Sequence, residues 1–130
     1  MNKSILTLSL LCALLTGVLL SSFTNKIEVE YDFQQVTTIE SVVPMGAGRS
    51  RMIATSPSGT LEESEMKNFF SVAGINFGNV RANDKATTDK ISQLVNAGWS
   101  LETVTSGVYS GTDSNNNGIF ITRYLFKKVK

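Results

Sequence analysis

Histidine is absent from the 130 residues, and cysteine occurs once, at Cys12. The lack of histidine excludes catalytic triads built on an imidazole, the usual zinc sites and imidazole acid–base chemistry. A single cysteine excludes a disulfide within the chain. The 12 basic and 11 acidic residues leave a net charge of +1, which favours neither nucleic acid nor an anionic membrane as a partner. Apolar residues make up 42%, a composition typical of one folded domain of this length.

Residues 1–24 have the pattern of a secretory signal peptide. Lys3 gives a positive start, and residues 5–20 are almost wholly apolar. The pattern predicts a signal peptide that is removed on export. The alternative is an uncleaved membrane anchor, because the stretch from Ile5 to Phe23 spans 19 residues, close to the ~20 that cross a bilayer. Residues 25–130 would then form a single exported domain that is periplasmic, secreted or membrane-anchored.

Several segments have the alternating or apolar pattern of β-strands. The predicted strands are residues 27–33, 49–55, 74–80, 99–108 and 119–129. The first could continue to residue 39 with a bulge near Val36. The last two flank a polar loop and predict a hairpin, and residues 119–129 are apolar on both faces, which predicts a central strand.

Two segments have helical patterns. Thr60 and Glu63 match a capping box and predict a helix over residues 61–71. Asn83 or Asp84 can cap a second helix, which Gly98 would end. Together the patterns predict an α+β fold in which an antiparallel or mixed sheet of four to five strands packs on two helices.

Three short motifs resemble a known family. Residues 94–101 (LVNAGWSL), residues 124–128 (YLFKK) and residues 30–33 (EYDF) resemble the bacterial domain-of-unknown-function family 4177. Residues 42–82 are longer than the connection usual in that family. The resemblance implies a small helix-and-sheet fold in which Trp99 packs at the junction of helix and sheet, and it implies no particular chemistry.

A polar segment offers the sequence's best cation-binding pattern. Asp113, Asn115 and Asn117, followed by Gly118, match the first half of a calcium loop. Tyr124 stands where such a loop has its bidentate glutamate, and the flanking segments are predicted strands rather than helices. A hairpin loop rich in Asn and Gly is therefore the favoured interpretation, and no metal or other cofactor is expected.

Arg49 and Arg51 are the best candidates for a binding site. On a strand they point to one side, about 6.5–7 Å apart, so two guanidinium groups could hold a carboxylate or a phosphate. They follow a glycine-bearing loop within the segment that exceeds the family pattern. The alternative is a structural one, in which these arginines pair across strands with Glu28 and Glu30.

Aromatic and basic residues alternate in the last predicted strand and its tail. The aromatic residues Phe120, Tyr124 and Phe126, together with Arg123, Lys127 and Lys128, could suggest a nucleic-acid platform. An exported domain without net charge argues against nucleic acid. Buried aromatic rings beside a basic tail are the simpler interpretation.

The composition and motifs favour a small exported bacterial domain without catalytic activity. We expect a binding or interaction module of the cell envelope, with an envelope protein or a small anionic ligand as partner. One alternative is a hydrolase that uses two of the carboxylates Glu28, Glu30 and Glu102, which requires them to converge in one cleft. Another is a membrane-tethered structural domain, if residues 1–24 are retained.

Overall fold

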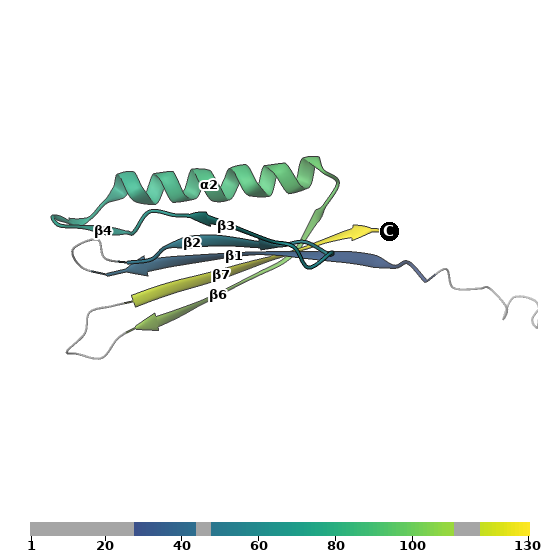
Figure 1. Ribbon diagram of the computed structural model, residues 1–130, viewed down its shortest axis with the longest axis horizontal. Helices are drawn as coiled ribbons and strands as arrows, with labels where there is room; N and C mark the ends of the chain where they lie inside the picture. The colour runs from purple at the N-terminus through teal and green to yellow at the C-terminus, as the bar shows by residue number, and fades with distance from the viewer. Residues whose placement is uncertain (1–27, 44–47, 111–117) are drawn as a thin grey trace, which may run out of the picture.

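The fold is an antiparallel five-stranded sheet with one long helix on one of its faces (Figure 1). The computed structural model describes residues 28–43, 48–110 and 118–130. The strand order in the sheet is β3-β2-β1-β7-β6. The bounds of these strands are β1 Tyr31–Val42, β2 Arg51–Thr55, β3 Leu61–Glu65, β6 Ser100–Ser110 and β7 Gly118–Val129. The short strands β4 Phe70–Ser71 and β5 Gly74–Ile75 pair with each other, and the helix α2 is Phe77–Asn96.

The two longest strands form the middle of the sheet. β1 pairs with β7 without interruption from Tyr31↔Val129 to Val42↔Gly118. The predicted hairpin of the last two strands is confirmed, as is the central position of the last strand, because β7 lies between β1 and β6. The bulge expected near Val36 is absent from that pairing, and the irregularity of the described sheet lies instead between Leu101 and Thr103 of β6.

The core lies between α2 and one face of the sheet. Its buried apolar residues come from β1, β2, β7, α2 and the segment after β3: Val36, Met52, Ala54, Met66, Leu94 and Phe126. Ile91, Trp99 and Tyr124 pack against this cluster and are partly buried. Burial of a side chain such as Phe126, which is fully covered, stabilises the fold by about 1.5–3 kcal/mol.

The helix predicted over residues 61–71 does not form. Residues 61–65 are strand β3, which pairs with β2, and residues 70–71 are strand β4. A tight turn precedes β3, in which the N–H of Ser56 donates to the Thr60 carbonyl (2.9 Å) and Gly59 adopts φ +80°. Glu63 of the expected capping box instead forms an ion pair with Arg51, and the neighbouring Glu62 pairs with Lys90. Long-range pairing therefore overrides the local capping pattern.

The N-cap of the observed helix lies seven residues before the predicted cap at Asn83. This N-cap is Asn76, whose side chain accepts hydrogen bonds from the N–H groups of Gly78 and Asn79. This early start limits the strand predicted over residues 74–80 to Gly74–Ile75. The described residues thus contain one long helix where the sequence predicted two.

The end of the helix agrees with the sequence. Gly98 has φ +87°, a left-handed conformation that glycine adopts without strain, and the N–H of Trp99 donates to the Leu94 carbonyl (3.0 Å). The turn directs Trp99 against the core and starts β6 on the outer side of β7.

Candidate functional site

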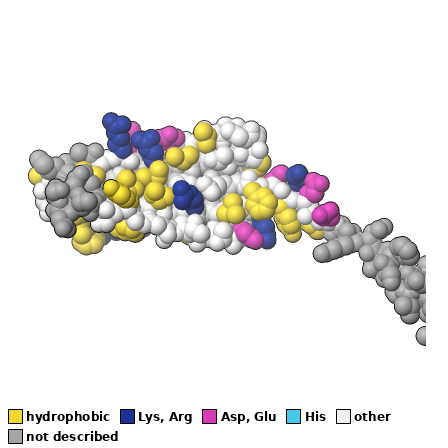
Figure 2. All heavy atoms as spheres, turned by 90° about the horizontal axis from the view of Figure 1, so that it is seen from below, with side chains coloured by type: hydrophobic (Ala, Val, Ile, Leu, Met, Phe, Trp, Pro, Cys, Tyr) yellow, Lys and Arg dark blue, Asp and Glu magenta, His cyan; other side chains and the backbone are white. Residues whose placement is uncertain are grey.

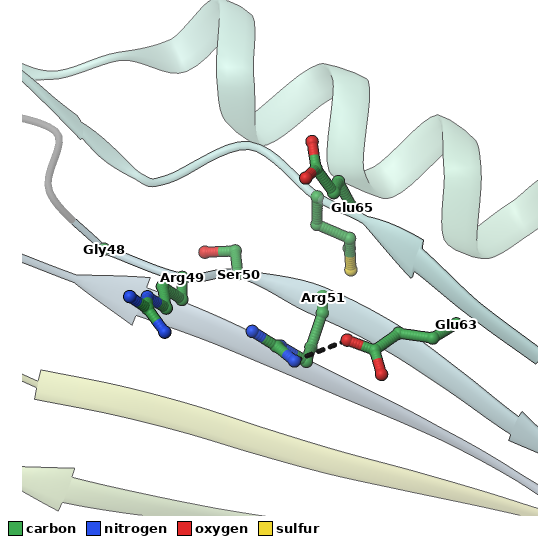
Figure 3. Close-up of a pocket in the computed structure, with 7 residues that line it drawn as sticks. Gly48, Arg49, Ser50, Arg51, Glu63 and Glu65 are labelled. Carbon is green, nitrogen blue, oxygen red and sulfur yellow. Dashed lines mark hydrogen bonds and ion pairs between the residues drawn. The ribbon is translucent and has the colours of Figure 1, made fainter.

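A cavity of about 400 Å³ lies where β2 and β3 meet (Figure 3). Its lining residues come from the segment before β2, from β2 and from the end of β3: Gly48, Arg49, Ser50, Arg51, Glu63, Glu65 and Met66. Both arginines singled out from the sequence therefore line one cavity. Carboxylates line it as well, so the cavity is polar and of mixed charge.

Backbone contacts hold the segment that carries these arginines. The N–H of Ser41 donates to Ser50 Oγ at 2.8 Å, and the N–H of Met66 donates to the Ser50 carbonyl at 3.0 Å. Gly48 packs so closely that an added Cβ would lie 2.3 Å from Asn68 Oδ1 and 2.6 Å from Ser41 Cβ. Only glycine fits at this position, which fixes the path of the chain into β2.

The two arginines differ in their partners. Arg51 forms an ion pair with Glu63 of β3 and not with Glu28 or Glu30, the partners that the structural alternative required. Glu30 instead pairs with Lys130 at 3.1 Å. Arg49 makes no ion pair with any described residue. In Figure 3 the Glu65 carboxylate points away from both guanidinium groups, although Glu65 is opposite Arg51 in the strand register.

Arg51 belongs to a larger surface, the face of the sheet opposite α2. Alternation along each strand places on this helix-free face the residues in register with Arg51, namely Ile39 of β1 and Ile121 of β7. The residues that pack on α2 have the other parity, as the hydrogen bond between Asn83 of the helix and Glu40 of β1 shows. Figure 2 views the molecule from this side, where hydrophobic side chains and separate basic side chains lie without a helix over them.

Arg123 stands on an inner strand of the helix-free face. In β7 it is in register with Thr37 of β1 on one side and Thr105 of β6 on the other, and its side chain is exposed. Among the described residues it has no ion-pair partner. Arg123 lies two strand positions away from Arg51 across the sheet and two residues away along the strand direction, which puts their Cα atoms about 12 Å apart. The sequence analysis did not select Arg123 as a site, because residues 119–129 are apolar on both faces and hide the alternation.

The aromatic residues of β7 do not share a face with its arginine. Phe120, Tyr124 and Phe126 lie on the side of α2, and Arg123 and Lys127 lie on the helix-free face. Lys128 shares the side of α2 with these rings, and its Nζ donates a hydrogen bond to the Ala97 carbonyl at 2.9 Å, so the basic residues of β7 are divided between the two faces.

An aromatic pair occupies one end of the helix-free face. The rings of Tyr31 and Phe33 lie 6.5 Å apart between centroids, and 39% and 51% of these residues are exposed. Lys127 Nζ lies 5.3 Å from the Tyr31 ring centroid and 2.6 Å from a Glu102 carboxylate oxygen. The hydrogen bond with Glu102 raises the pKa of Lys127, so this ammonium is charged at neutral pH.

The carboxylates proposed for hydrolysis are held apart. Glu30 pairs with Lys130 at the C-terminal end of the chain, and Glu102 pairs with Lys127. Glu28 precedes β1 and is exposed. None of these three residues lines the cavity between β2 and β3.

The carboxyl of Glu40 is half-buried on the side of the sheet that faces α2. Burial raises its pKa, and the hydrogen bond from Asn83 Nδ2 at 3.0 Å lowers it by a smaller amount. Asn83 also bonds both backbone groups of Lys67 at 2.8 Å. These contacts join β1, α2 and the segment between β3 and β4, so they serve the packing of the fold.

The predicted calcium ligands Asp113, Asn115 and Asn117 lie outside the described residues. Within residues 28–43, 48–110 and 118–130, no three Asp, Glu, His or Cys side chains gather as a metal site would require. No helix in the same part of the chain is long and apolar enough to span a membrane.

No family model, curated protein or solved structure matches this chain significantly. The candidate site therefore rests on the geometry of the helix-free face and of the cavity at its margin.

Proposed function

We propose that residues 25–130 form a non-catalytic binding module of the bacterial cell envelope, exported by means of residues 1–24. Its binding surface is the helix-free face, and its partner is an acidic segment of an envelope protein. The resemblance to family 4177 supports the choice of a small bacterial domain and adds no chemistry. Retention of residues 1–24 would tether the same module to the membrane.

The observation that carries the proposal is the exposed guanidinium of Arg123, which has no ion-pair partner among the described residues and stands on the helix-free face of the sheet. On this face the acidic residues lie on the edge strands β3 and β6, and two of them are engaged, Glu63 by Arg51 and Glu102 by Lys127. The positive charge of Arg123 has no such partner in the part of the chain that the structure describes. An arginine presents a planar set of donors that binds a carboxylate through two parallel hydrogen bonds.

The surroundings of Arg123 favour a peptide chain over a small inorganic ion. Ile121 and Leu125 lie two residues before and after it in β7 on the same face, and both are half-buried. Thr37 and Thr105 place hydroxyl groups in register with it. An acidic side chain flanked by apolar residues would satisfy both kinds of neighbour. Exposed aromatic residues such as Tyr31 and Phe33 provide further contact area of the kind that dominates protein interfaces.

Arg49 and Arg51 extend this surface toward the cavity between β2 and β3. Arg49 has no carboxylate partner among the described residues, and Arg51 could exchange Glu63 for an acidic group of the ligand. We assign these two arginines to the margin of the site, where they would select for a second acidic residue of the partner.

Affinity measurements with a defined probe test this proposal. The probe is a synthetic ten-residue peptide of alternating glutamate and valine, titrated by calorimetry against the protein at low salt. We expect Arg123→Gln to weaken binding about tenfold or more, which corresponds to about 1.4 kcal/mol or more. The matched control is Arg81→Gln, because Arg81 is an exposed arginine on α2 without an ion pair among the described residues. Equal losses for both variants would contradict a site on the helix-free face.

A further inference from the structure

The outer edge of β6 is an edge of the sheet that the proposed binding site does not use. Every residue of β6 is exposed, and in the part of the chain that the structure describes the strand has one neighbour, β7. In such a strand, alternate N–H and C=O groups point outward and are available to pair with another strand. From Thr103 to Tyr109 the strand carries no charge and no proline.

The opposite edge of the same sheet is protected by charge. β3 carries three glutamates in five residues, at 62, 63 and 65, so pairing with its own copy would bring like charges together. Charged side chains are a common device that prevents an edge strand from pairing. β6 lacks this protection over the seven residues after its irregularity, and the charge of Glu102 before them is engaged by Lys127 of its own chain.

The sequence of β6 is self-complementary about Ser106. If a second copy of β6 pairs antiparallel with Ser106 opposite Ser106, Val104 comes opposite Val108 twice, on the face of α2. Val104 and Val108 are 47% and 63% exposed in the single chain, so this pairing would cover two apolar contacts. On the helix-free face, Tyr109 would lie opposite Thr103, and Thr105 opposite Gly107. Cross-strand pairs of β-branched and aromatic residues stabilise sheets by about 0.2–1 kcal/mol each.

We propose that β6 pairs with β6 of a second copy of this chain, which joins two five-stranded sheets into one continuous sheet around a two-fold axis at Ser106. The interface is isologous and closes on itself, so the assembly stops at a dimer. The two helix-free faces then lie side by side. The two Glu102 carboxylates stand apart from the axis, four residues away on each strand, where they do not repel each other across it.

Disulfide trapping of the full chain in its own cells tests the pairing. A Cys12→Ser background removes the native thiol, and Ser106→Cys then places two cysteines opposite each other at the axis. Directly opposed residues of antiparallel strands have Cα atoms about 4.5–5.5 Å apart, within the range that a disulfide bridges. We expect a covalent dimer under mild oxidation. The matched control is Ser64→Cys, an exposed serine of the acidic edge strand β3, which should give at least about tenfold less dimer.

A second variant tests the dimer without relying on this register. Val104→Lys places a charge on the exposed edge, and we expect sedimentation equilibrium to show a monomer where the native chain is a dimer. The circular dichroism spectrum should stay unchanged, because Val104 lies outside the core. The proposal is wrong if the native chain is monomeric, if Val104→Lys remains dimeric, or if both cysteine variants cross-link equally. A cross-link from Ser106→Cys to a different protein would also overturn it, and would assign the edge to a foreign strand.

Discussion

Asn83 offers the sharpest test of how the helix is fixed to the rest of the fold. This residue is 2% exposed, and its side chain makes three hydrogen bonds: it accepts from the N–H of Lys67 and donates to the Lys67 carbonyl and to Glu40. Asn83→Ala removes all three and leaves both backbone groups of Lys67 without these partners. The three hydrogen bonds are part-buried, and a typical one contributes about 0.5–1.5 kcal/mol, so we expect a loss of about 2–4 kcal/mol.

Urea unfolding followed by circular dichroism measures this loss. The unfolding midpoint should fall while the dependence on urea stays the same, because the exposed area changes little. Thr88→Ala is the control, since Thr88 is exposed on the same helix and its replacement should change stability by less than about 0.5 kcal/mol. Asn83→Asp keeps an acceptor for Lys67 and places a second carboxylate beside Glu40, so it should destabilise the fold more at pH 7 than at pH 4. A loss below about 1 kcal/mol for Asn83→Ala would refute the reasoning.

Three further predictions concern single positions. The pKa of the Glu40 carboxyl is raised above 4.5 in the folded chain, so the stability of the fold falls as pH rises from about this value through the folded-state pKa. Urea unfolding at a series of pH values should show that Glu40→Gln removes this fall. An unchanged pH profile in the variant would contradict the prediction. Replacing a fully buried tryptophan with alanine costs about 3–5 kcal/mol. Trp99 is only partly buried, so Trp99→Ala should cost less than this and lower the melting temperature correspondingly less. Arg51→Gln should cost about 0.2–1 kcal/mol at low salt and almost nothing at high salt, and a salt-independent loss would argue against the Glu63 ion pair.

The C-terminal part of the fold was predictable because its signals are local. The strand over residues 119–129 is apolar on both faces, as a central strand is, and a polar loop joins it to the strand before it. Gly98 marks the end of the helix through its left-handed conformation. These features depend on neighbouring residues and needed no knowledge of the rest of the chain.

Residues 60–71 were not predictable in the same way. Thr60 and Glu63 match a capping box, but the turn at Gly59 returns the chain along β2, and Glu63 pairs with Arg51 twelve residues earlier. The start of α2 was missed for a related reason. Asn83 has the chemistry of a cap, but it lies inside the helix because its amide bonds Lys67, sixteen residues away.

The candidate site was predictable in part. The spacing of Arg49 and Arg51 identified two residues that line one cavity. The alternative that paired them with Glu28 and Glu30 was wrong for Glu30, which forms its ion pair with Lys130, the last residue of the sequence. Arg123 was missed because its importance comes from the absence of a second layer over the helix-free face. In the described residues, the exposure of this face depends on where α2 packs, which no local pattern reveals.

Chemical-shift mapping by NMR tests the binding face most directly. The alternating glutamate and valine peptide is added to isotope-labelled protein, and the amide signals are followed residue by residue. The account predicts that the largest shifts occur at Arg123, Thr37 and Thr105 and that Arg123→Gln abolishes them, while signals from the exposed side of α2 stay in place. Shifts centred on α2, or shifts on the sheet that persist in Arg123→Gln, would contradict it.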